Sequence, residues 1–542
     1  MAQAPPAPSP PDGASWIASA ALATALFACY LGFAPPVSGD KDASEFALAL
    51  ATGGVIHPTG YPIYTMLGHV FVRLLHGMGA SFPFAANAWA SLGGGVAMFF
   101  YHRLALRFIP PRAGRSRLEP YLLAAVPVLL LAFNPVWMVE CTSVEVHSWQ
   151  LAWLFGTSLC FIGTIERLEA GALRASALTR RMVAWGFLCG LGGAHHTTAI
   201  FMVTGMTAVL VWALVRGRRF HAWVPLVWLA AGVVPLLSYG YIYYKATHPS
   251  AVGTWPMLAP TFSSVLEHIT ARAYRIYLGH WAPDGAQSAW LRWYIHPYLW
   301  PGLALFAFQA FKARDRILGR VAVGLLVGAL AQTLFTFQYG VGDPDAYFLP
   351  GLAVGLLALP WAGGSARPTF TRTAFVVLAL AAFIQSGVFV AGGRKQIIVA
   401  TDADDHALWT TIPYPRAIVL WPSDEADRLK QYQVFRHEKP GLDVYNTKGL
   451  MNPYARARFQ QRYGFDALAL LDEAHHAQPI KPEFVIGEQA SQDDAHAFAL
   501  VTEYMTLKAG IPVVAFDPPK PVRAWVPYAE ASDSTTSGAA PR

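Results

Sequence analysis

The segment 37–64 carries the residues most suited to chemistry in this 542-residue chain. It holds Asp40, Asp42, Glu45 and His57 among small and apolar neighbours. Asp42 and Glu45 are three positions apart, so on a helix both carboxylates lie on one face. Such a pair can take a proton from a reacting hydroxyl or contribute ligands to a divalent cation.

Each of these residues also has a purely structural interpretation. Asp42 is suited to cap the N-terminus of a helix, with Glu45 facing solvent. His57 opens the motif His-Pro-Thr-Gly-Tyr-Pro, which is also typical of a turn that starts the next helix. Sequence alone leaves both interpretations open, so the surrounding elements must be considered.

Composition indicates a polytopic membrane protein. The chain is 54% hydrophobic and 13% charged, with a mean hydropathy of +0.35, whereas soluble proteins carry about 25% charged residues. The formal charge of +7 is explained by basic cytoplasmic loops, and we expect no nucleic-acid partner. Four scattered cysteines show neither zinc spacing nor a disulfide framework.

A helix needs about 20 apolar residues to cross the ~30 Å hydrocarbon layer. Eleven segments are predicted to do so: 15–36, 84–101, 120–138, 146–165, 182–195, 197–215, 222–244, 297–312, 321–339, 346–362 and 373–391. The segments 182–195 and 197–215 are expected to form a hairpin that turns near His195 and His196. We expect the first span to be retained as a helix rather than cleaved, because no basic segment precedes it.

Charge in the loops predicts the orientation. Eighteen Lys and Arg residues lie in one set of loops, and only six lie in the alternate set up to the last span. By the positive-inside rule the first set is cytoplasmic. The N-terminus is then inside and the C-terminal region outside; in a bacterium the protein would lie in the cytoplasmic (inner) membrane.

After the last span the sequence becomes more polar. Strands are predicted at 417–421, 442–446, 483–487 and 511–516, alternating with helices at about 424–437, 453–472 and 493–508, a pattern typical of an α/β domain with a parallel sheet. The predicted fold is therefore mainly α, a helical bundle with an extracytoplasmic α/β domain. Its divisions are a disordered 1–14, a membrane domain 15–392, the α/β domain 393–530 and a disordered tail 531–542.

The predicted topology brings polar segments from five parts of the chain to the outer face. Ionisable residues at membrane depth are costly and usually functional, and a one-sided distribution argues for a site. Besides the 37–64 segment, these parts carry Glu140, Glu145 and His147; His195 and His196; Trp255, His268, Arg272, Tyr274 and Arg275; and Asp343, Asp345 and Tyr347.

Structural alternatives remain for these segments as well. A hydrogen-bonded core pair would explain His195 and His196. An amphipathic helix resting on the membrane would explain His268 and Arg272, which are four positions apart. The glycines Gly186, Gly190 and Gly193 favour close helix packing.

The first outer loop resembles the protein O-mannosyltransferase-like membrane family. The family pattern, Asp-x-Gly-Glu followed by Gly-Val-x-His-Pro-Pro-Gly-x-Pro-Leu, is matched by Asp42-Ala-Ser-Glu45 and by Gly54-Val-Ile-His57-Pro58-Thr-Gly-Tyr-Pro-Ile. Weaker matches continue in order to about residue 390: Glu145-Val-His147-Ser148, Gly190-Leu191 with His196-Thr197, the Trp255 loop with His268 and Arg272, and Asp343-Pro-Asp-Ala-Tyr347-Phe-Leu-Pro. Ser44, Thr59 and His147 depart from the family's glycine, proline and tyrosine.

This resemblance implies a GT-C glycosyltransferase that transfers a sugar, such as the hexose mannose, from a polyprenyl-phosphate donor to an acceptor hydroxyl. The acceptor would be a protein Ser or Thr, or a glycan, at the outer surface of the lipid bilayer. Asp42 would be the catalytic base and Glu45 would orient the acceptor or tune Asp42, with inversion by a single displacement. No cofactor is certain, and a divalent metal such as Mg or Mn is left open.

The remaining site residues are expected to bind substrate: His57, Glu145, His195, His196, His268, Arg272, Asp343 and Tyr347. Arg272 with His268, or His195 with His196, would bind the lipid phosphate. Three alternatives stay open: a non-catalytic lipid-sugar binding or assembly protein, a polysaccharide ligase or polymerase, and a secondary transporter. A transporter is expected to place ionisable groups near the midplane, often within inverted repeats, and no repeat is visible in this chain.

Overall fold

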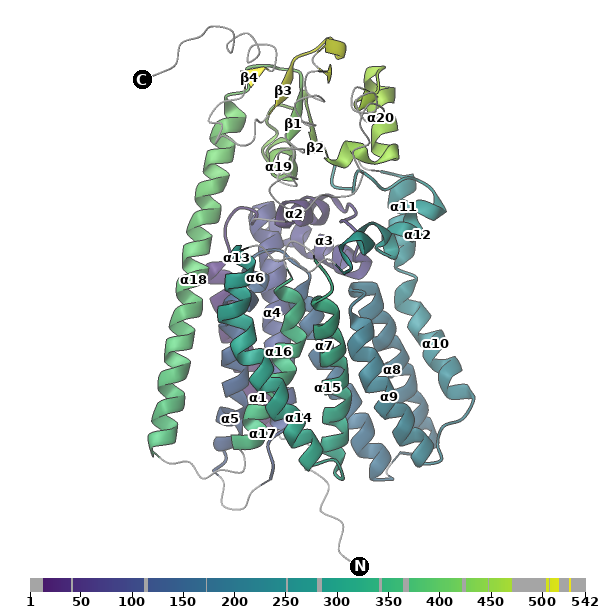
Figure 1. The fold of residues 1–542 in the computed structure, drawn as a ribbon, viewed down its shortest axis with the longest axis vertical. Coiled ribbons are helices and arrows are strands. Elements are labelled where there is room, and N and C mark those ends of the chain that lie inside the picture. The colour runs from purple at the N-terminus through teal and green to yellow at the C-terminus, as the bar shows by residue number, and fades with distance from the viewer. Residues whose placement is uncertain are drawn as a thin grey trace, which may run out of the picture.

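A computed structural model describes residues 13–39, 42–111, 116–171, 173–249, 252–279, 285–340, 344–363, 370–421, 426–446, 448–469, 504–505, 507–515 and 526–527. The long helices run roughly along the longest axis of the molecule (Figure 1). Together with shorter helices that continue or connect them, the bundle comprises α1 (Gly13–Phe33), α4 (Phe82–Arg107), α5 (Glu119–Ala132), α6 (Pro135–Thr142), α7 (His147–Glu169), α8 (Ala175–His195), α9 (Ala199–Arg216), α10 (Trp223–Leu236), α11 (Tyr239–Thr247), α14 (His296–Lys312), α15 (Ile317–Thr336), α16 (Leu349–Leu356), α17 (Ala358–Gly363) and α18 (Phe370–Thr410).

Each of the eleven predicted spans coincides with a helix or a pair of helices. Within the described residues, seven helical segments are long and apolar enough to cross a membrane, or eight if the bent pair α5–α6 counts as one. The other predicted spans fall on α4, α8 and α14. Helix α14 is shorter, with 17 residues, and α4 and α8 carry more polar and small residues.

The span predicted at 120–138 is not a straight helix. Helices α5 and α6 meet at an angle of 75°. Asn134 caps α6 by accepting a hydrogen bond from the Val136 N–H, and Pro135 begins that helix. A proline cannot donate the backbone hydrogen bond that a continuous helix requires, so the chain bends at this point.

Glycines allow helices α8 and α10 to approach closely. A Cβ atom added to Gly186 would lie 2.5 Å from the Trp228 carbonyl oxygen, and one added to Gly190 would lie 2.0 Å from that of Gly232. Helices α8 and α10 are therefore in backbone contact, as the sequence predicted. This packing supports the hairpin α8–α9, whose turn at His196–Thr198 also agrees with the prediction.

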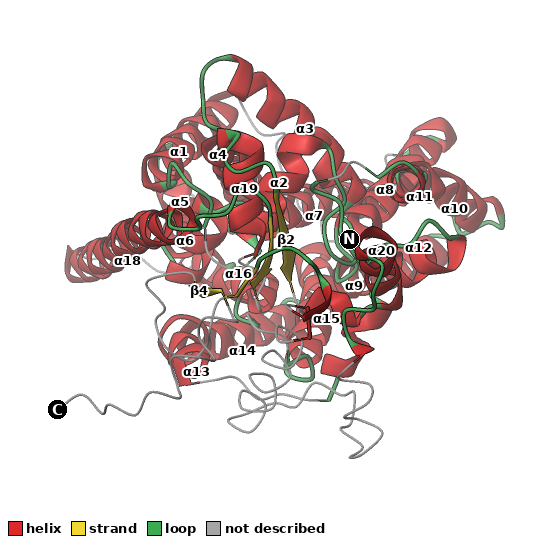
Figure 2. Cartoon of the chain, turned by 90° about the horizontal axis from the view of Figure 1, so that it is seen from above, coloured by secondary structure: helices red, strands yellow, loops and turns green. Residues whose placement is uncertain are grey.

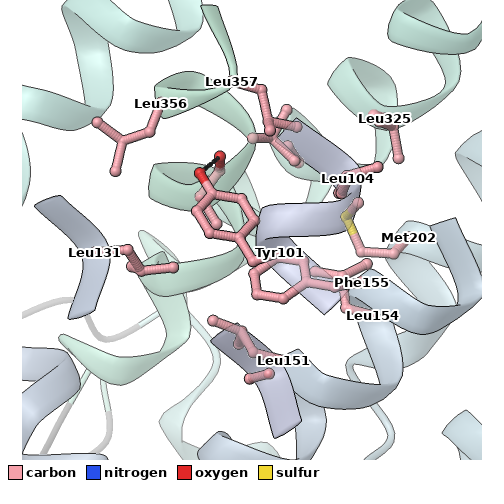
Figure 3. Packing of buried hydrophobic residues seen from close by; sticks show 14 of the residues in the cluster. Tyr101, Leu104, Leu131, Leu151, Leu154, Phe155, Met202, Leu325, Leu356 and Leu357 are labelled. Carbon is pink, nitrogen blue, oxygen red and sulfur yellow. Dashed lines mark hydrogen bonds between the residues drawn. The ribbon is translucent and has the colours of Figure 1, made fainter. Parts of the chain in front are cut away.

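Tyr101 lies at the centre of the apolar core (Figure 3). Its hydroxyl donates a hydrogen bond to the Ala353 carbonyl at 2.6 Å, and its ring stacks on Phe155 with centroids 4.5 Å apart. Ala353 lies in α16, so the Tyr101 side chain joins α4 to α16. The polar hydroxyl of a buried tyrosine needs such a partner.

Shorter elements cover one end of the bundle, the end predicted to face outward. They are α2 (Ala43–Thr52), α3 (Pro62–Gly77), α12 (Phe262–Ile269), the 3-10 turns η1 (Arg272–Tyr277) and η3 (Ala346–Phe348), α13 (Gly285–Trp290) and the π-helical turn η2 (Leu291–Ile295). Most of them lie at the end of the bundle that also carries the strands (Figure 1).

Helix α18 extends far beyond the predicted span 373–391. It has 41 residues, which at 1.5 Å per residue gives a length of about 60 Å. This is about twice the hydrocarbon thickness, and Figure 1 shows α18 running from one end of the bundle to the strands at the other. The predicted domain boundary at 392/393 therefore lies inside a continuous helix.

The C-terminal region forms a four-stranded sheet in the order β2-β1-β3-β4. Strand β1 (Ala417–Trp421) pairs in parallel with β2 (Leu442–Asn446) and β3 (Val513–Ala515), as predicted, while β4 (Val526–Pro527) is antiparallel to β3. Helices α19 (Ala426–Arg436), η4 (Lys448–Met451) and α20 (Pro453–Tyr463) accompany it.

Two predictions for this region need correction or remain open. Helix α20 ends at Tyr463 rather than at 472, because Gly464 adopts a left-handed conformation with φ 81°, which terminates a helix. The strand predicted at 483–487, most of the helix at 493–508, most of 1–14 and the whole tail 531–542 lie outside the described residues.

Candidate active site

The acidic pair lies at the start of α2. Asp42 occupies the N-cap position, with φ −74° and ψ −7°, but its side chain accepts no capping hydrogen bond from the helix. The capping interpretation of Asp42 is therefore wrong. The Asp42 side chain is 39% exposed, whereas that of Glu45 is 12% exposed, so the two carboxylates occupy different environments.

Glu45 holds His57 by two hydrogen bonds. The backbone N–H of His57 donates to Glu45 Oε1 at 2.7 Å, and the ring Nδ1 lies 2.8 Å from Oε2. Because a carboxylate accepts, Nδ1 carries the proton, and Nε2 is the nitrogen that faces Asp42. Asp42 Oδ2 lies 3.9 Å from Nε2, so the imidazole stands between the two carboxylates.

Burial raises the pKa of the Glu45 carboxyl from its ordinary value of 4.5 to about 7, although His57 opposes this shift. Loss of hydration disfavours the charged carboxylate, and the neighbouring imidazole only partly replaces the lost water. Asp42 adds a smaller shift in the same direction. Glu45 therefore titrates near neutral pH, and perturbed carboxyl groups of this kind are common at catalytic sites.

The backbone between Glu45 and His57 is fixed by a second segment of the chain. The Trp255 N–H donates to the Val55 carbonyl at 2.8 Å, and the Tyr241 hydroxyl donates to the carbonyl of Gly53 at 2.6 Å. His268 Nε2 donates to the Ile56 carbonyl at 3.0 Å. Residues from α11 and α12 thus position the peptide that precedes His57.

Aromatic rings from four further segments surround His57 and its neighbour Tyr61. Trp255 and Tyr274 each lie 6.1 Å from the His57 ring, centroid to centroid. Tyr61 stacks on His196 at 5.5 Å. Beyond them, His147, His196 and Tyr347 contact one another at 5.2–5.8 Å. All five predicted segments therefore meet at one place.

The two histidines of the hairpin have different contacts. His195 Nε2 donates to the Val146 carbonyl at 3.2 Å, and His196 Nδ1 lies 2.8 Å from the Thr198 hydroxyl. The ring of His195 also lies 5.8 Å from that of Tyr64, whose hydroxyl donates to the carbonyl of Glu145 at 3.3 Å. Both histidines are buried, and their predicted phosphate contacts stay predictions.

The predicted phosphate-binding pair is separated in the structure. His268 is buried, and burial lowers the pKa of its imidazole to about 3, so it is neutral. Arg272 is exposed and pairs with Glu267 at 2.6 Å. The two side chains therefore do not form one group here, although Arg272 remains near the site through Tyr274. Asp343 lies outside the described residues.

Sequence reasoning missed several residues that build the site. Tyr61 adopts a positive φ of 41° at the start of α3, and Tyr241 binds the loop carbonyls. The motif around His57 contained Tyr61 and could have indicated it. Gln431 and Arg428 of α19 also bind the first outer loop, and no local signal in the sequence points to them.

Asp42, Glu45 and His57 each offer a ligand atom, and these atoms lie within 4.8 Å of one another. Both Glu45 oxygens, however, already accept hydrogen bonds from His57, one from its backbone N–H and one from its ring Nδ1. A cation would have to compete with these hydrogen bonds for Glu45, and the present arrangement fits a hydrogen-bonded carboxylate–imidazole pair better than a metal centre. We therefore assign no chemical step to a metal.

An apolar groove opens beside this cluster. It has a volume of about 420 Å³ and is lined by residues of α3, α4, α7 and α8, among them Tyr64, Trp149, Trp153 and Gly156. Tyr64 connects the groove to the cluster, because its ring lies 5.9 Å from that of Phe46 on α2. From the start of α7 to Gly156 the groove descends about 14 Å along that helix, at 1.5 Å per residue.

Comparison with known proteins shows which family and which folds this chain is similar to. The family model described as the N-terminal domain of the protein O-mannosyl-transferase TMEM260 matches residues 42–218. The predicted family resemblance is confirmed. The match begins at Asp42 and includes Glu45, His57 and both hairpin histidines.

A curated relative, the protein O-mannosyl-transferase tmem260 of Dictyostelium discoideum, is 22% identical over 196 residues. The alignment covers 35% of this chain and 22% of the relative. The chain therefore matches about a fifth of that protein's length.

Two solved structures share the fold. ArnT from Cupriavidus metallidurans, bound to undecaprenyl phosphate, gives a TM-score of 0.53 at 15% identity and covers 83% of this chain and 89% of its own. The archaeal oligosaccharyltransferase AglB from Archaeoglobus fulgidus, in complex with an inhibitory peptide and a dolichol-phosphate, gives 0.51 at 13% identity and covers 92% of this chain and 69% of its own. The mainly helical GT-C fold class is confirmed, and the chain is an integral membrane protein.

Proposed function

We propose that this protein is a membrane glycosyltransferase that transfers a sugar from a polyprenyl phosphate to a hydroxyl group at the outer face of the membrane. The observation that carries this proposal is the position of the Asp42–Glu45–His57 cluster beside the apolar groove. An acid–base cluster next to a lipid-sized groove suits a donor whose reactive end is polar and whose tail is hydrocarbon.

Asp42 is the proposed general base. It is the more exposed of the two carboxylates, so an acceptor hydroxyl can reach it. In the reaction the acceptor oxygen forms a bond to the anomeric carbon and its proton passes to Asp42. The bond from that carbon to the phosphate oxygen breaks, and the phosphate leaves with the electron pair. One such displacement inverts the configuration.

Glu45 and His57 are proposed to orient the acceptor and Asp42. The imidazole is fixed through Nδ1 by Glu45, which leaves Nε2 directed toward Asp42. A histidine held in one tautomer by a carboxylate is the usual means of keeping such a ring oriented. The Tyr61 hydroxyl lies 3.4 Å from the same Nε2 atom, so Tyr61 also contacts the imidazole.

The leaving phosphate requires positive charge. Arg272 is the proposed partner, because it is exposed at the start of η1 while Tyr274 of the same turn contacts His57. A guanidinium binds phosphate oxygens in a bidentate manner. In this proposal Arg272 exchanges Glu267 for the donor phosphate.

The groove between α3, α4, α7 and α8 is proposed to hold the polyprenyl tail. Its lining is almost entirely apolar, and Leu67 at its edge is 57% exposed, so a lipid can enter from the side. The solved structures of ArnT and AglB, which share the fold, contain undecaprenyl phosphate and dolichol-phosphate, respectively. Mannose as the sugar and a protein Ser or Thr as the acceptor follow from the names of the related transferases.

The decisive experiment compares Asp42→Asn with Asp404→Asn in the full-length protein reconstituted in lipid nanodiscs. Asp404 is an exposed acid on α18 and serves as the matched control. Transfer of radiolabelled mannose from polyprenyl-phosphate mannose to a Ser/Thr peptide is measured. We expect kcat to fall about 10²–10⁴-fold for Asp42→Asn, the usual contribution of a general base, and to be unchanged for Asp404→Asn.

Full activity of Asp42→Asn would remove Asp42 as the base. Donor binding without transfer or hydrolysis by the unmodified protein would instead indicate a non-catalytic binder. Activity after EDTA treatment tests metal dependence in the same assay. Transfer that is retained after EDTA would agree with the hydrogen-bonded pair of Glu45 and His57 acting without a metal.

A further inference from the structure

The segment that carries Asp42 is held at both ends by one residue of the C-terminal region. The Ser38 hydroxyl donates to Gln431 Oε1 at 2.9 Å, and Gln431 Nε2 donates to the Ser44 carbonyl at 2.8 Å. The side-chain oxygens of Ser38 and Ser44 also lie 3.2 Å apart. All three residues are buried, so water does not readily substitute for these contacts.

A second residue of α19 holds Gly39, the neighbour of Ser38. Arg428 Nη2 donates to the Gly39 carbonyl at 2.9 Å, while Nη1 pairs with Asp405 of α18 at 2.7 Å. Arg428 is 2% exposed. The guanidinium therefore joins α18, α19 and the first outer loop at one point.

Ser143 confines Gly39 from another side. A Cβ atom added to Gly39 would lie 2.5 Å from the Ser143 hydroxyl oxygen, which in turn accepts a hydrogen bond from Arg394 of α18 at 2.9 Å. Gly39 is thus enclosed between Ser143 and Arg428. Figure 2 shows α19 lying beside α2 near the centre of the molecule when seen from above.

We propose that Gln431 and Arg428 are positioning residues that hold Ser38, Gly39 and Ser44 so that Asp42 faces His57, and that the C-terminal region thereby completes the active site. This inference rests on the proposed function of Asp42. It assigns to α19 a role in the transfer step itself.

The arrangement also accounts for Ser44. This residue stands where the related motif has glycine, and its added hydroxyl must be satisfied because the residue is buried. Ser38 supplies that contact, and Gln431 binds both serines. The Ser44 hydroxyl that replaces the motif's glycine thus has a partner in Ser38, which is itself held by Gln431.

Gln431 is a better probe than Arg428. Removing Arg428 would leave Asp405 as a buried charge without its partner, which destabilises a protein strongly whatever the role of the loop. Gln431 is uncharged, and α19 offers a matched control: Gln433, two positions later, donates to the carbonyls of Lys439 and Leu442. Its contacts stay within the C-terminal region.

The experiment compares Gln431→Ala with Gln433→Ala in full-length protein in nanodiscs. Amide hydrogen exchange is measured for peptides covering 38–48, and kcat and KM are measured with polyprenyl-phosphate mannose. For Gln431→Ala we expect exchange in 38–48 to become at least about tenfold faster and kcat to fall by a similar factor, with donor KM unchanged. Gln433→Ala should match the unmodified protein in exchange and kcat.

A third variant, Ser38→Ala, removes one of the two Gln431 contacts. Its exchange rate in 38–48 and its kcat should lie between those of Gln431→Ala and Gln433→Ala. Unchanged exchange and unchanged kcat in Gln431→Ala would overturn the proposal, as would equal effects of Gln431→Ala and Gln433→Ala. If the unmodified protein transfers no sugar, the proposed function fails, and the exchange measurement still decides whether α19 holds the loop.

Discussion

At the scale of single residues, Glu45 and His57 determine how the site responds to pH. Glu45 is buried and accepts two hydrogen bonds from His57, whereas Asp42 remains accessible. Two carboxylates three positions apart therefore have distinct roles because their surroundings differ, an arrangement typical of acid–base catalysis.

Activity should rise with pH as Glu45 loses its proton, since only the carboxylate can accept both hydrogen bonds from His57. We expect kcat/KM to increase through about pH 7, the raised pKa of Glu45. Glu45→Gln should lower kcat by about 10–100-fold and abolish this inflection. The control is Glu438→Gln, because Glu438 forms a comparable pair with His406 at 3.0 Å in the C-terminal region; an inflection that persists in Glu45→Gln would contradict the assignment.

Stability should decrease as the pH rises, whereas activity should increase. The folded pKa of Glu45 lies above its ordinary value, so this residue stabilises the fold fully below about pH 4.5, and the contribution is lost as the pH rises through about 7. Thermal unfolding measured across this range should show a smaller decrease for Glu45→Gln than for the unmodified protein.

At the scale of elements, the site depends on close contact between the loop after α2 and the loop after α11. A Cβ atom added to Gly54 would lie 1.5 Å from the Gly253 carbonyl oxygen. The hydrogen bond from Trp255 to Val55 joins the same two loops. No side chain larger than hydrogen fits at Gly54 without moving one of them.

Gly54→Ala should therefore displace His57 and lower kcat by at least about tenfold, and overpacking should cost about 1–3 kcal/mol of stability. Gly240→Ala is the control, because nothing lies within 4 Å of the position of its added Cβ in α11. Both variants are assayed for transfer and for thermal unfolding. Equal activity of the two would mean that the loop contact does not position His57.

At the scale of the whole molecule, the bundle provides a lipid-accessible groove and the C-terminal region covers the polar end. Helix α18 connects the two, since it crosses the bundle and then binds α19 through Asp405 and Asp402. In the proposed function, the candidate site thus lies where the apolar bundle meets the polar C-terminal region, a position suited to a polyprenyl phosphate that presents its sugar there.

Filling the groove should weaken binding of long-chain donors selectively. Gly156→Leu places a side chain beside Phe100, 3.5–3.8 Å from the position of the added Cβ, inside the groove. We expect donor KM to rise at least about tenfold with a long polyprenyl chain and little with a short one, because only the long tail reaches this depth. Gly163→Leu on the same helix is the control. An equal effect on both donors would place the tail elsewhere.

The proposed orientation is tested by labelling single cysteines in intact cells. The native cysteines Cys29, Cys141, Cys160 and Cys189 are first replaced by alanine. Lys508→Cys should react with a membrane-impermeant maleimide and Asp315→Cys should react only after permeabilisation, because both positions are exposed and basic loops stay inside. The reverse result would invert the topology.

The sequence by itself determined the helices, the strands at 417–421 and 442–446, and the candidate cluster around Asp42, Glu45 and His57. These features depend on local properties: apolar length, alternation of strands and helices, and a short motif whose residues are neighbours in the chain. The gathering of five outer segments also followed, because membrane topology restricts each loop to one of two faces.

Only the tertiary structure decided which side chains meet within that face. It joined Glu45 to His57 and left Arg272 outside with Glu267, and it placed Gln431 nearly 400 residues along the chain against Ser38 and Ser44. The physical reason is that these contacts depend on how helices and loops pack across long stretches of sequence, where a hydrogen bond is set by position in space and leaves no periodic or local pattern.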